Sequence, residues 1–377
     1  MLSVLLLFLL PCCATHLPLN KHASRSLPTG KIIAGYSTGC SGQEDMILQE
    51  AERGVNLLIW SFINLRVDPV SKKQDFGFSI NTTCIAAVAQ ELTRRGLPTS
   101  HLISIGGWDA PHPDTSYTAK EWWAFFKDWN EGYVANPELG FDGFAGIDWD
   151  VEGVNNLTSA YNEISLECFQ LMGEMSHLAK GDGYLVTVVP AQSYLNPSVP
   201  QVDLSLRHSS PCAADFHYAG SNGYTALLAK YGSDTFDLVS VQLYETWSYI
   251  NCKIRSLGNP PKQLREFVRS YTTPFWMDFS NITKLGIDIP PEDWHVHISP
   301  SQLLVGFSFG AGGSGKSIYI APTDLGEALH GDDLPKENWP RGAFFWNLDL
   351  DGNRPVNGTA FNTSFASGFN DIFHTRV

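Results

Sequence analysis

Residues 141–153 read FDGFAGIDWDVEG, and in this stretch the carboxylates Asp148, Asp150 and Glu152 are separated by single apolar residues. A period of two is the geometry of a β-strand, so the three carboxylates project to one face. Like charges on a buried face repel each other, so one or more of the carboxyls must hold a proton near neutral pH or be heavily hydrogen-bonded. Acid–base chemistry explains such a cluster better than stability does. The alternatives are a solvated edge strand, which the apolar flanks disfavour, and a divalent-cation site.

The composition limits which partners the chain can have. Of its 377 residues 43% are hydrophobic and 17% charged, so a large core is possible and global disorder is excluded. The net charge of −14 argues against nucleic acid, heparin or an anionic membrane surface as the partner. We therefore expect a neutral or cationic substrate and no nucleic acid partner. A monomer is a separate expectation that does not follow from the charge.

The first residues have the pattern of a secretory signal peptide. An apolar run at 2–10 is followed by Pro-Cys-Cys-Ala at 11–14, and it is too short to span a bilayer. We expect a signal peptide over about 1–14, then a polar leader over 15–30. Five glycosylation sequons support export, with a lysosome or vacuole as the other destination: Asn81, Asn156, Asn281, Asn357 and Asn362.

Five cysteines remain after the signal peptide: Cys40, Cys84, Cys168, Cys212 and Cys252. An odd number allows at most two disulfides and leaves one free thiol. Cys168 lies in a segment with helical periodicity, so we expect it to be the buried free cysteine. The pairing of Cys40 with Cys84 and of Cys212 with Cys252 is a hypothesis only.

Short apolar runs alternate with helical patterns along the chain. The expected strands are 31–36, 56–64, 101–107, 144–152, 184–190, 237–244, 303–309 and 342–346. The expected helices are 43–53, 84–95, 122–136, 166–180, 223–231 and 262–271. Eight buried strands separated by helices predict a closed (β/α)₈ TIM barrel, a single domain over 31–377.

The carboxyl ends of the strands line the active site in such a barrel. Several aromatic residues are expected there beside Glu152: Tyr36, Phe62, Trp108, Tyr244 and Trp346. Aromatic side chains around a carboxylate cluster predict a groove that stacks sugar rings, although aromatics at strand ends often serve only packing.

Four motifs in order resemble those of glycoside hydrolase family 18, the chitinases and their relatives. The D-G-x-D-x-D-x-E motif corresponds to 145–152 (AGIDWDVE), S-x-G-G to 104–107, the Met/Gln-x-Tyr motif to 242–244 (QLY) and the strand-eight Trp to Trp346. The shorter G-Y and S-F patterns occur at 35–36 and 61–62, and the resemblance runs from about 31 to 350.

Two departures from the family pattern stand out. Ala145 replaces the first Asp of the long motif, from which we expect altered pKa values more than lost activity. Only about thirty residues separate strands seven and eight, so the large α+β insertion of many processive chitinases is not expected, and the groove should be shallow.

The resemblance implies a substrate-assisted, retaining mechanism on β-1,4-linked N-acetylglucosamine polymers, without cofactor or metal. Glu152 would be the general acid, and the substrate's own acetamido oxygen would be the nucleophile. Asp150 would bind the acetamido N–H and share a proton with Asp148. Tyr244 would align the acetamido oxygen. The implied substrate contacts are Tyr36, Phe62, Gly107, Trp108, Gln242 and, as the floor of the site, Trp346.

Other motifs point to competing functions. Residues 306–310 (GFSFG) match the esterase elbow around Ser308, with Asp324 and His330 as possible partners, and 310–317 match a P-loop. Neither is followed by a good helix start, so we interpret them as a barrel strand with Ser308 inside and a glycine loop on the rim of the groove.

Two patterns resemble metal sites. His295 and His297 lack a third ligand, so we expect surface strand histidines. Residues 349–353 resemble the start of a calcium loop, but the position of its acidic last ligand holds Ala360, and we expect a turn.

Two rivals share the expected fold. One is a catalytically dead chitin- or glycan-binding lectin, which the presence of Glu152, Asp150 and Tyr244 disfavours. The other is an endo-β-N-acetylglucosaminidase acting on N-glycan cores, which Glu245 keeps open because many chitinases carry Asp after the Tyr.

Overall fold

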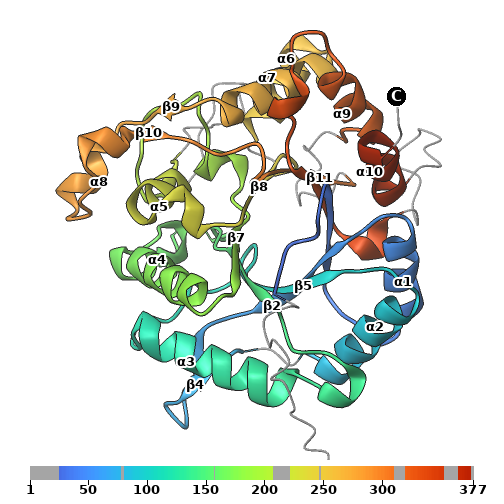
Figure 1. Ribbon diagram of the computed structural model, residues 1–377. Helices are drawn as coiled ribbons and strands as arrows, with labels where there is room; N and C mark the ends of the chain where they lie inside the picture. The colour runs from blue at the N-terminus through green and yellow to red at the C-terminus, as the bar shows by residue number, and fades with distance from the viewer. Residues whose placement is uncertain are drawn as a thin grey trace, which may run out of the picture.

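Eight parallel strands close into a barrel at the centre of the molecule. The computed structural model describes residues 25–77, 80–156, 158–206, 221–245, 248–309, 319–351 and 364–374. The strands are β1 (Ile32–Ser37), β2 (Leu57–Ile63), β5 (Ser100–Gly106), β6 (Gly146–Asp150), β7 (Leu185–Val188), β8 (Leu238–Gln242), β11 (Leu303–Ser308) and β12 (Gly342–Trp346). Their order around the barrel is β1-β12-β11-β8-β7-β6-β5-β2, with helices outside, as Figure 1 shows. The predicted (β/α)₈ barrel is confirmed.

Ten α-helices are seen in the described residues. They are α1 (Glu44–Glu52), α2 (Thr82–Arg94), α3 (Ala119–Trp129), α4 (Leu166–Gly181), α5 (Gly223–Tyr231), α6 (Tyr249–Leu257), α7 (Pro260–Thr272), α8 (Ser280–Lys284), α9 (Pro322–Leu329) and α10 (Phe365–His374). The six predicted helices are present, and four further helices were not predicted. Two small antiparallel sheets of two strands each lie outside the barrel: β3 (Arg66–Val67) with β4 (Gln74–Asp75), and β9 (Phe275–Trp276) with β10 (His295–Val296). The described residues between β11 and β12 hold only α9 and one 3₁₀ turn, consistent with no large insertion there.

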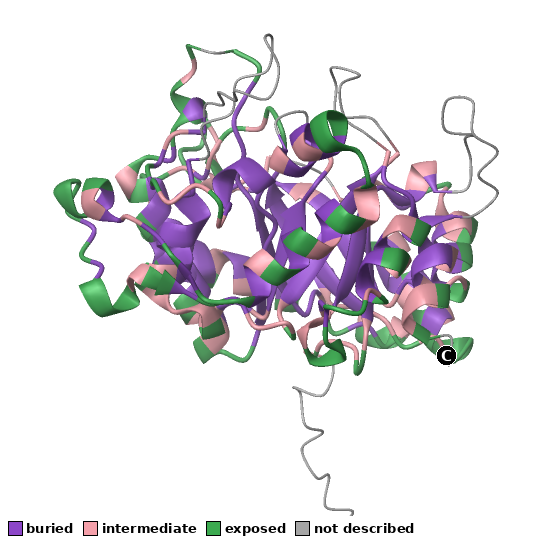
Figure 2. Cartoon of the chain, turned by 90° about the horizontal axis from the view of Figure 1, so that it is seen from above, coloured by how far each residue is buried: buried purple, intermediate pink, exposed green. Residues whose placement is uncertain are grey.

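The strands bury both faces, as their continuous apolar runs predicted. One apolar cluster fills the barrel, and the larger one lies between the strands and the helices. Figure 2 shows the buried barrel surrounded by helices that are exposed on their outer sides. On β6, Trp149 points to the outer cluster and donates to Ser176 Oγ at 2.9 Å, while Asp148 and Asp150 occupy the inner face.

The described end of the predicted leader belongs to the fold. Leu27 packs against the cluster inside the barrel. The carbonyl of Ser26 accepts from Ser100 Oγ at 2.6 Å, and that of Pro28 accepts from Arg341 at 2.9 Å. These partners stand at strand starts, so residues 25–30 lie at the amino-terminal end of the barrel, opposite the expected site.

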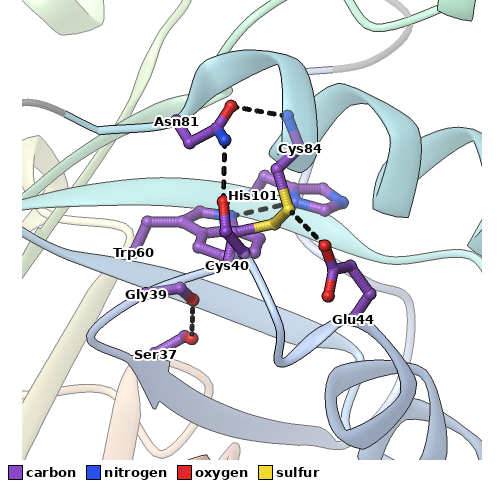
Figure 3. The surroundings of a disulfide bond; sticks show 9 residues. Ser37, Gly39, Cys40, Glu44, Trp60, Asn81, Cys84 and His101 are labelled. Atoms are coloured by element: carbon purple, nitrogen blue, oxygen red, sulfur yellow. Dashed lines mark hydrogen bonds between the residues drawn. A yellow bond between two sulfur atoms is a disulfide. The ribbon is translucent and has the colours of Figure 1, made fainter.

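The described cysteines agree with the sequence hypothesis. Cys40 and Cys84 form a disulfide that ties the segment after β1 to α2, as Figure 3 shows, and Cys168 is free and buried. Cys252 is also disulfide-bonded, and Cys212, its predicted partner, lies outside the described residues.

The described sequons agree with an exposed position. Asn81, Asn156 and Asn281 are exposed. The expected signal peptide and the sequons at Asn357 and Asn362 lie outside the described residues. No helix in the described part of the chain is long and apolar enough to cross a membrane.

Candidate active site

Glycines bring β5 and β6 together beneath the carboxylates. A Cβ atom on Gly106 would lie 2.3 Å from the carbonyl oxygen of Asp150, and Gly106 has a φ of +113°, so no side chain fits there. The next residue, Gly107, donates its N–H to the same carbonyl at 2.7 Å. The predicted strand 144–152 included Glu152. Strand β6 ends at Asp150, so Glu152 lies two residues past the strand.

Side chains from other elements hold the backbone beyond the end of β6. The Tyr224 hydroxyl accepts from Val151 N–H at 2.8 Å and donates to Val151 C=O at 3.0 Å. The remaining contacts are His112 Nε2 to Glu152 C=O (2.9 Å), Gly153 N–H to the Tyr194 hydroxyl (3.3 Å) and Val154 N–H to Asn162 Oδ1 (2.9 Å). Buried backbone groups without sheet partners need such bonds, and the bonds fix the position of Glu152.

Asp148 is completely buried and fully hydrogen-bonded. Its Oδ2 accepts from the hydroxyls of Tyr36 and Ser104, both at 2.8 Å, and its Oδ1 accepts from Thr187. Burial raises the pKa of Asp148, and the three hydroxyl donors act against that rise. The residue joins β1, β5, β6 and β7 inside the barrel.

Asp150 and Glu152 form a buried pair that Gln242 of β8 bridges. Gln242 Nε2 lies 3.0 Å from Asp150 Oδ1 and 3.1 Å from Glu152 Oε1. Burial raises the pKa of Asp150 well above its ordinary value, and the charge of Glu152 adds to the rise. Burial also raises the pKa of Glu152, while the hydrogen bonds from Asp150 and Gln242 lower it. Asp150 and Glu152 therefore share the Gln242 donor, while three hydroxyl groups bind Asp148. The sharing of a proton between Asp150 and Asp148 during the reaction stays a prediction.

Aromatic rings line the mouth of the barrel beside this pair. The rings of Phe62 and Trp346 stack 5.6 Å apart, and Tyr36 lies 5.8 Å from Trp346. Gly107 leaves room for Phe62, because a Cβ there would lie 2.9 Å from the ring. The structure thus brings these four predicted contacts together at one place.

Tyr244 and Trp108 complete the set of predicted aromatics. Tyr244 is half-buried on the segment after β8, with its ring 6.3 Å from Phe344. Its hydroxyl makes no hydrogen bond within the described residues, and burial together with the nearby carboxylates raises its pKa well above the ordinary value. Trp108 follows β5 and is 40% exposed.

Glu245 adds a fourth buried carboxyl near the pair. Its two oxygens accept from the N–H (2.8 Å) and the Oγ (3.0 Å) of Ser193. Burial raises the pKa of Glu245 to about 8, and the charge of Glu152 contributes to the rise. Glu245 is therefore turned toward the segment after β7.

The competing motifs have structural roles where they are described. Ser308 is buried on β11, as the barrel-strand interpretation predicted, while Asp324 accepts from Ala321 N–H at the start of α9 and His330 packs on Trp339. The P-loop match at 310–317 lies outside the described residues.

The two metal-like patterns also have structural explanations. His295 lies on β10, and both it and His297 are exposed, in agreement with the prediction. Asp351 accepts from Phe365 N–H and Ala366 N–H at the start of α10. Among the described residues no group of three or more His, Cys, Asp or Glu side chains is placed to hold a metal ion.

A cavity of about 230 Å³ lies away from the carboxylates, beside the Cys40–Cys84 disulfide. Its walls come from the segment after β1, from β2 and from the start of α2, and they include Trp60, Asn81 and Ile85. Figure 3 shows Trp60 and Asn81 near the disulfide. None of the predicted site residues lines this cavity.

Sequence reasoning missed several residues that build the site. These are Thr187, Tyr224, Tyr194, His112 and Ser193, none of which belongs to a motif. Thr187 alone had a signal, because it is the polar residue in the middle of an otherwise apolar predicted strand.

Solved structures of chitinases resemble this chain. The catalytic domain of a hyperthermophilic chitinase from Pyrococcus furiosus aligns with a TM-score of 0.52 and 14% identity, over 93% of this chain and 98% of that one. A family GH18 chitinase from Chromobacterium violaceum aligns with a TM-score of 0.50 and 12% identity, over 86% and 81%. This chain has the chitinase fold.

An inhibitor protein of known structure also aligns with this chain. A xylanase and α-amylase inhibitor protein from Scadoxus multiflorus aligns with a TM-score of 0.45 and 16% identity, over 84% of this chain and 93% of that one. A scan of protein families finds no match, and a search of curated proteins finds no relative. At these identities the solved structures show the fold alone.

Proposed function

We propose that the protein is a glycoside hydrolase that cleaves β-1,4-linked N-acetylglucosamine polymers. The observation that carries the proposal is the buried Asp150–Glu152 pair, bridged by Gln242 at the mouth of the barrel. Burial raises the pKa of both carboxyls, which favours a proton held by the pair, and a general acid needs such a proton. A lectin has no need to bury such a pair, because burial of carboxyls costs stability.

The proposed reaction uses Glu152 first as acid and then as base. Glu152 gives its proton to the glycosidic oxygen as the bond from that oxygen to the anomeric carbon breaks. The acetamido oxygen of the same sugar forms the new bond to the anomeric carbon, giving a cyclic oxazolinium ion. Water then attacks that carbon, gives a proton to Glu152 and reopens the ring, so the configuration is retained.

Asp150 and Tyr244 position the acetamido group in this proposal. The Asp150 carboxyl accepts from the acetamido N–H and faces the positive charge that develops on the ring, a charge that it stabilises electrostatically. The Tyr244 hydroxyl, which is unengaged within the described residues, donates to the acetamido oxygen. Asp148 keeps Tyr36, Ser104 and Thr187 in place beneath them.

The aromatic mouth supplies the sugar contacts. Trp346 forms the floor, and Phe62 and Tyr36 support it at ring distances of 5.6 and 5.8 Å. The exposed Trp108 stacks on a sugar farther along the groove, because an aromatic face and the C–H face of a pyranose ring are both apolar. Gln242 and Gly107 complete the proposed contacts.

Disulfide bonding supports secretion. The Cys40–Cys84 bond and the bonded state of Cys252 fit an oxidising compartment. The exposed sequon asparagines in the described residues fit a glycoprotein. We therefore propose an extracellular enzyme. The alternative location is a lysosome or vacuole.

Two substrates test the proposal directly. Hydrolysis of a fluorogenic chitotriose, and not of an N-glycan that carries the chitobiose core, is the expected result. Proton NMR of the first product should show the β-anomer, as retention requires. Cleavage of the N-glycan alone would make the protein an endo-β-N-acetylglucosaminidase. Absence of hydrolysis of both, with chitin still bound, would make it a lectin and would overturn the proposal.

A further inference from the structure

We infer that His112 is a positioning residue that fixes the backbone of Glu152 for catalysis. This inference rests on the proposed function of Glu152, but it comes from a different part of the molecule. His112 lies on the loop that follows β5, and no motif includes it. Its Nε2 lies 2.9 Å from the Glu152 carbonyl oxygen.

The direction of this hydrogen bond follows from its chemistry. A carbonyl oxygen can only accept, so Nε2 must carry the ring proton. Burial lowers the pKa of His112, so the ring is neutral at neutral pH with its single proton on Nε2. The ring packs beside Tyr161, at a centroid distance of 5.2 Å, which holds its orientation.

The bond fixes one side of the peptide group that follows Glu152. The other side of this group is the N–H of Gly153, which donates to the Tyr194 hydroxyl at 3.3 Å. His112 belongs to the loop after β5 and Tyr194 to the segment after β7, so the peptide is held from both flanking strands. Since Glu152 lies beyond the end of β6, no sheet hydrogen bond replaces these contacts.

The loop after β5 runs beside the segment after β6 and is hydrogen-bonded to it. Gly107 N–H donates to Asp150 C=O at 2.7 Å, and Asp109 N–H donates to Gly153 C=O at 3.3 Å. Asp109 Oδ1 also accepts from Asn155 N–H at 2.8 Å. His112 is the one side chain among these contacts that reaches the carbonyl of Glu152 itself. Its loss should misplace the acid relative to the glycosidic oxygen, and misplacement of this kind lowers kcat more than it changes KM.

The chain contains a closely matched control. His177 Nε2 lies 2.8 Å from the carbonyl oxygen of Tyr231, and the two rings are 5.2 Å apart. This pair has the same chemistry, but it joins α4 to the end of α5 on the outside of the barrel. His177→Phe therefore removes the same kind of bond away from the site.

The experiment compares His112→Phe, His112→Gln and His177→Phe in the full chain. We expect His112→Phe to lower kcat on chitotriose about tenfold with KM within twofold, because one hydrogen bond is lost. His112→Gln keeps an N–H donor at the same reach and should stay within threefold of wild type. His177→Phe should leave kcat unchanged even if it lowers the melting temperature.

Hydrogen exchange gives a readout that does not depend on activity. Peptides spanning 151–156 should exchange faster in His112→Phe than in the wild type, and near the wild-type rate in the other two variants. Equal exchange and kcat in His112→Phe and wild type would overturn the inference, as would a loss in His112→Gln as large as that in His112→Phe. If the wild type hydrolyses no substrate, the proposed function fails, and exchange alone decides the role of His112.

Discussion

Asp150 and Glu152 meet at a single amide nitrogen, with Gln242 Nε2 3.0 Å from one carboxyl and 3.1 Å from the other. The same nitrogen lies 2.9 Å from the carbonyl oxygen of Val189. An NH₂ group has two hydrogens for these three acceptors, so the two carboxyls are best satisfied when they also share a proton. The bridge thus favours a pair that holds one proton.

The bridge should set the pH dependence of activity. Hydrogen bonds from Gln242 lower the pKa of both Asp150 and Glu152. Gln242→Met removes these bonds, so the pKa of each carboxyl should rise. The alkaline limb of the profile of kcat/KM against pH, where the general acid loses its proton, should then move to higher pH. The measurement is hydrolysis of fluorogenic chitotriose from pH 4 to 10.

Gln302→Met is the control for this variant. Gln302 Nε2 donates to Ser233 C=O and Phe236 C=O, at 2.8 and 2.7 Å, at the opposite end of the barrel. Its loss should lower stability without moving the alkaline limb. A limb that stays in place in Gln242→Met would show that the bridge does not tune the acid.

Substitution of Tyr244 should affect catalysis, whereas substitution of Tyr224 should affect stability. The Tyr244 hydroxyl makes no hydrogen bond within the described residues, whereas the Tyr224 hydroxyl bonds both backbone groups of Val151. We expect Tyr244→Phe to lower kcat about a hundredfold, the usual effect of losing a donor to the reacting group, with little change in melting temperature. Tyr224→Phe should instead lower the free energy of unfolding by about 1–3 kcal/mol.

Kinetics with thermal denaturation of the same preparations checks both tyrosine variants. A Tyr244→Phe enzyme with wild-type kcat would mean that this hydroxyl does not touch the reacting acetamido group.

Glu50 makes stability depend on pH far from the active site. It is fully buried on α1 near Asp351, which accepts from two N–H groups at the start of α10. Burial raises the pKa of Glu50 to about 9, and the hydrogen bond and the charge of Asp351 contribute to the rise. Because the folded pKa exceeds the unfolded value of 4.5, the folded state binds more protons between pH 4.5 and 9. Stability is therefore lost as pH rises through this window, by up to about 1.4 kcal/mol per pH unit.

Glu50→Gln should remove this dependence. Gln needs no proton to donate toward Asp351, so the variant should unfold at a higher temperature than wild type at pH 8 and at a similar temperature at pH 4.5. Glu52→Gln on the same helix removes an exposed carboxylate paired with Arg95 and should change stability by less than about 1 kcal/mol. If the melting temperatures of Glu50→Gln and wild type changed equally between pH 4.5 and 9, the result would contradict this explanation.

Ala145 shows why this chain departs from the motif that it resembles. Its side chain is 4% exposed in the apolar cluster inside the barrel, with Leu185 and Leu57. Restoring the acidic residue with Ala145→Asp would place a carboxyl among these groups, so we expect a loss of about 2–4 kcal/mol in chemical denaturation. Unchanged stability with a shifted pH profile would show instead that the site retains a place for the missing charge.

The barrel was predictable because its strands are apolar on both faces. Such runs as 56–64 and 303–309 stand out in any sequence, and eight of them limit the topology to few choices. The helices that escaped prediction lack this contrast. Helix α9 begins at Pro322, and it was not predicted although proline suits the first turn of a helix. The first N–H group of helix α10, that of Phe365, donates to Asp351, which lies 14 residues earlier in the chain. A cap at that distance has no local sequence signal.

The carboxylates of the site were predictable for a different reason. Their spacing on one strand is local information, whereas the hydrogen bonds to Asp148 and Glu152 come from residues distant in sequence. Thr187 lies 39 residues from Asp148, and His112 lies 40 from Glu152. A local pattern cannot predict which hydroxyl or imidazole the fold brings to a carboxyl.

The most direct test of the central claim is hydrolysis of fluorogenic chitotriose by Glu152→Gln beside the wild type, with chitin binding measured on both. The account predicts that kcat falls by at least about a hundredfold, as expected when a general acid is lost, while chitin binding is retained. A Glu152→Gln protein that hydrolyses chitotriose at the wild-type rate would contradict the account, because the reaction would then need no proton from Glu152.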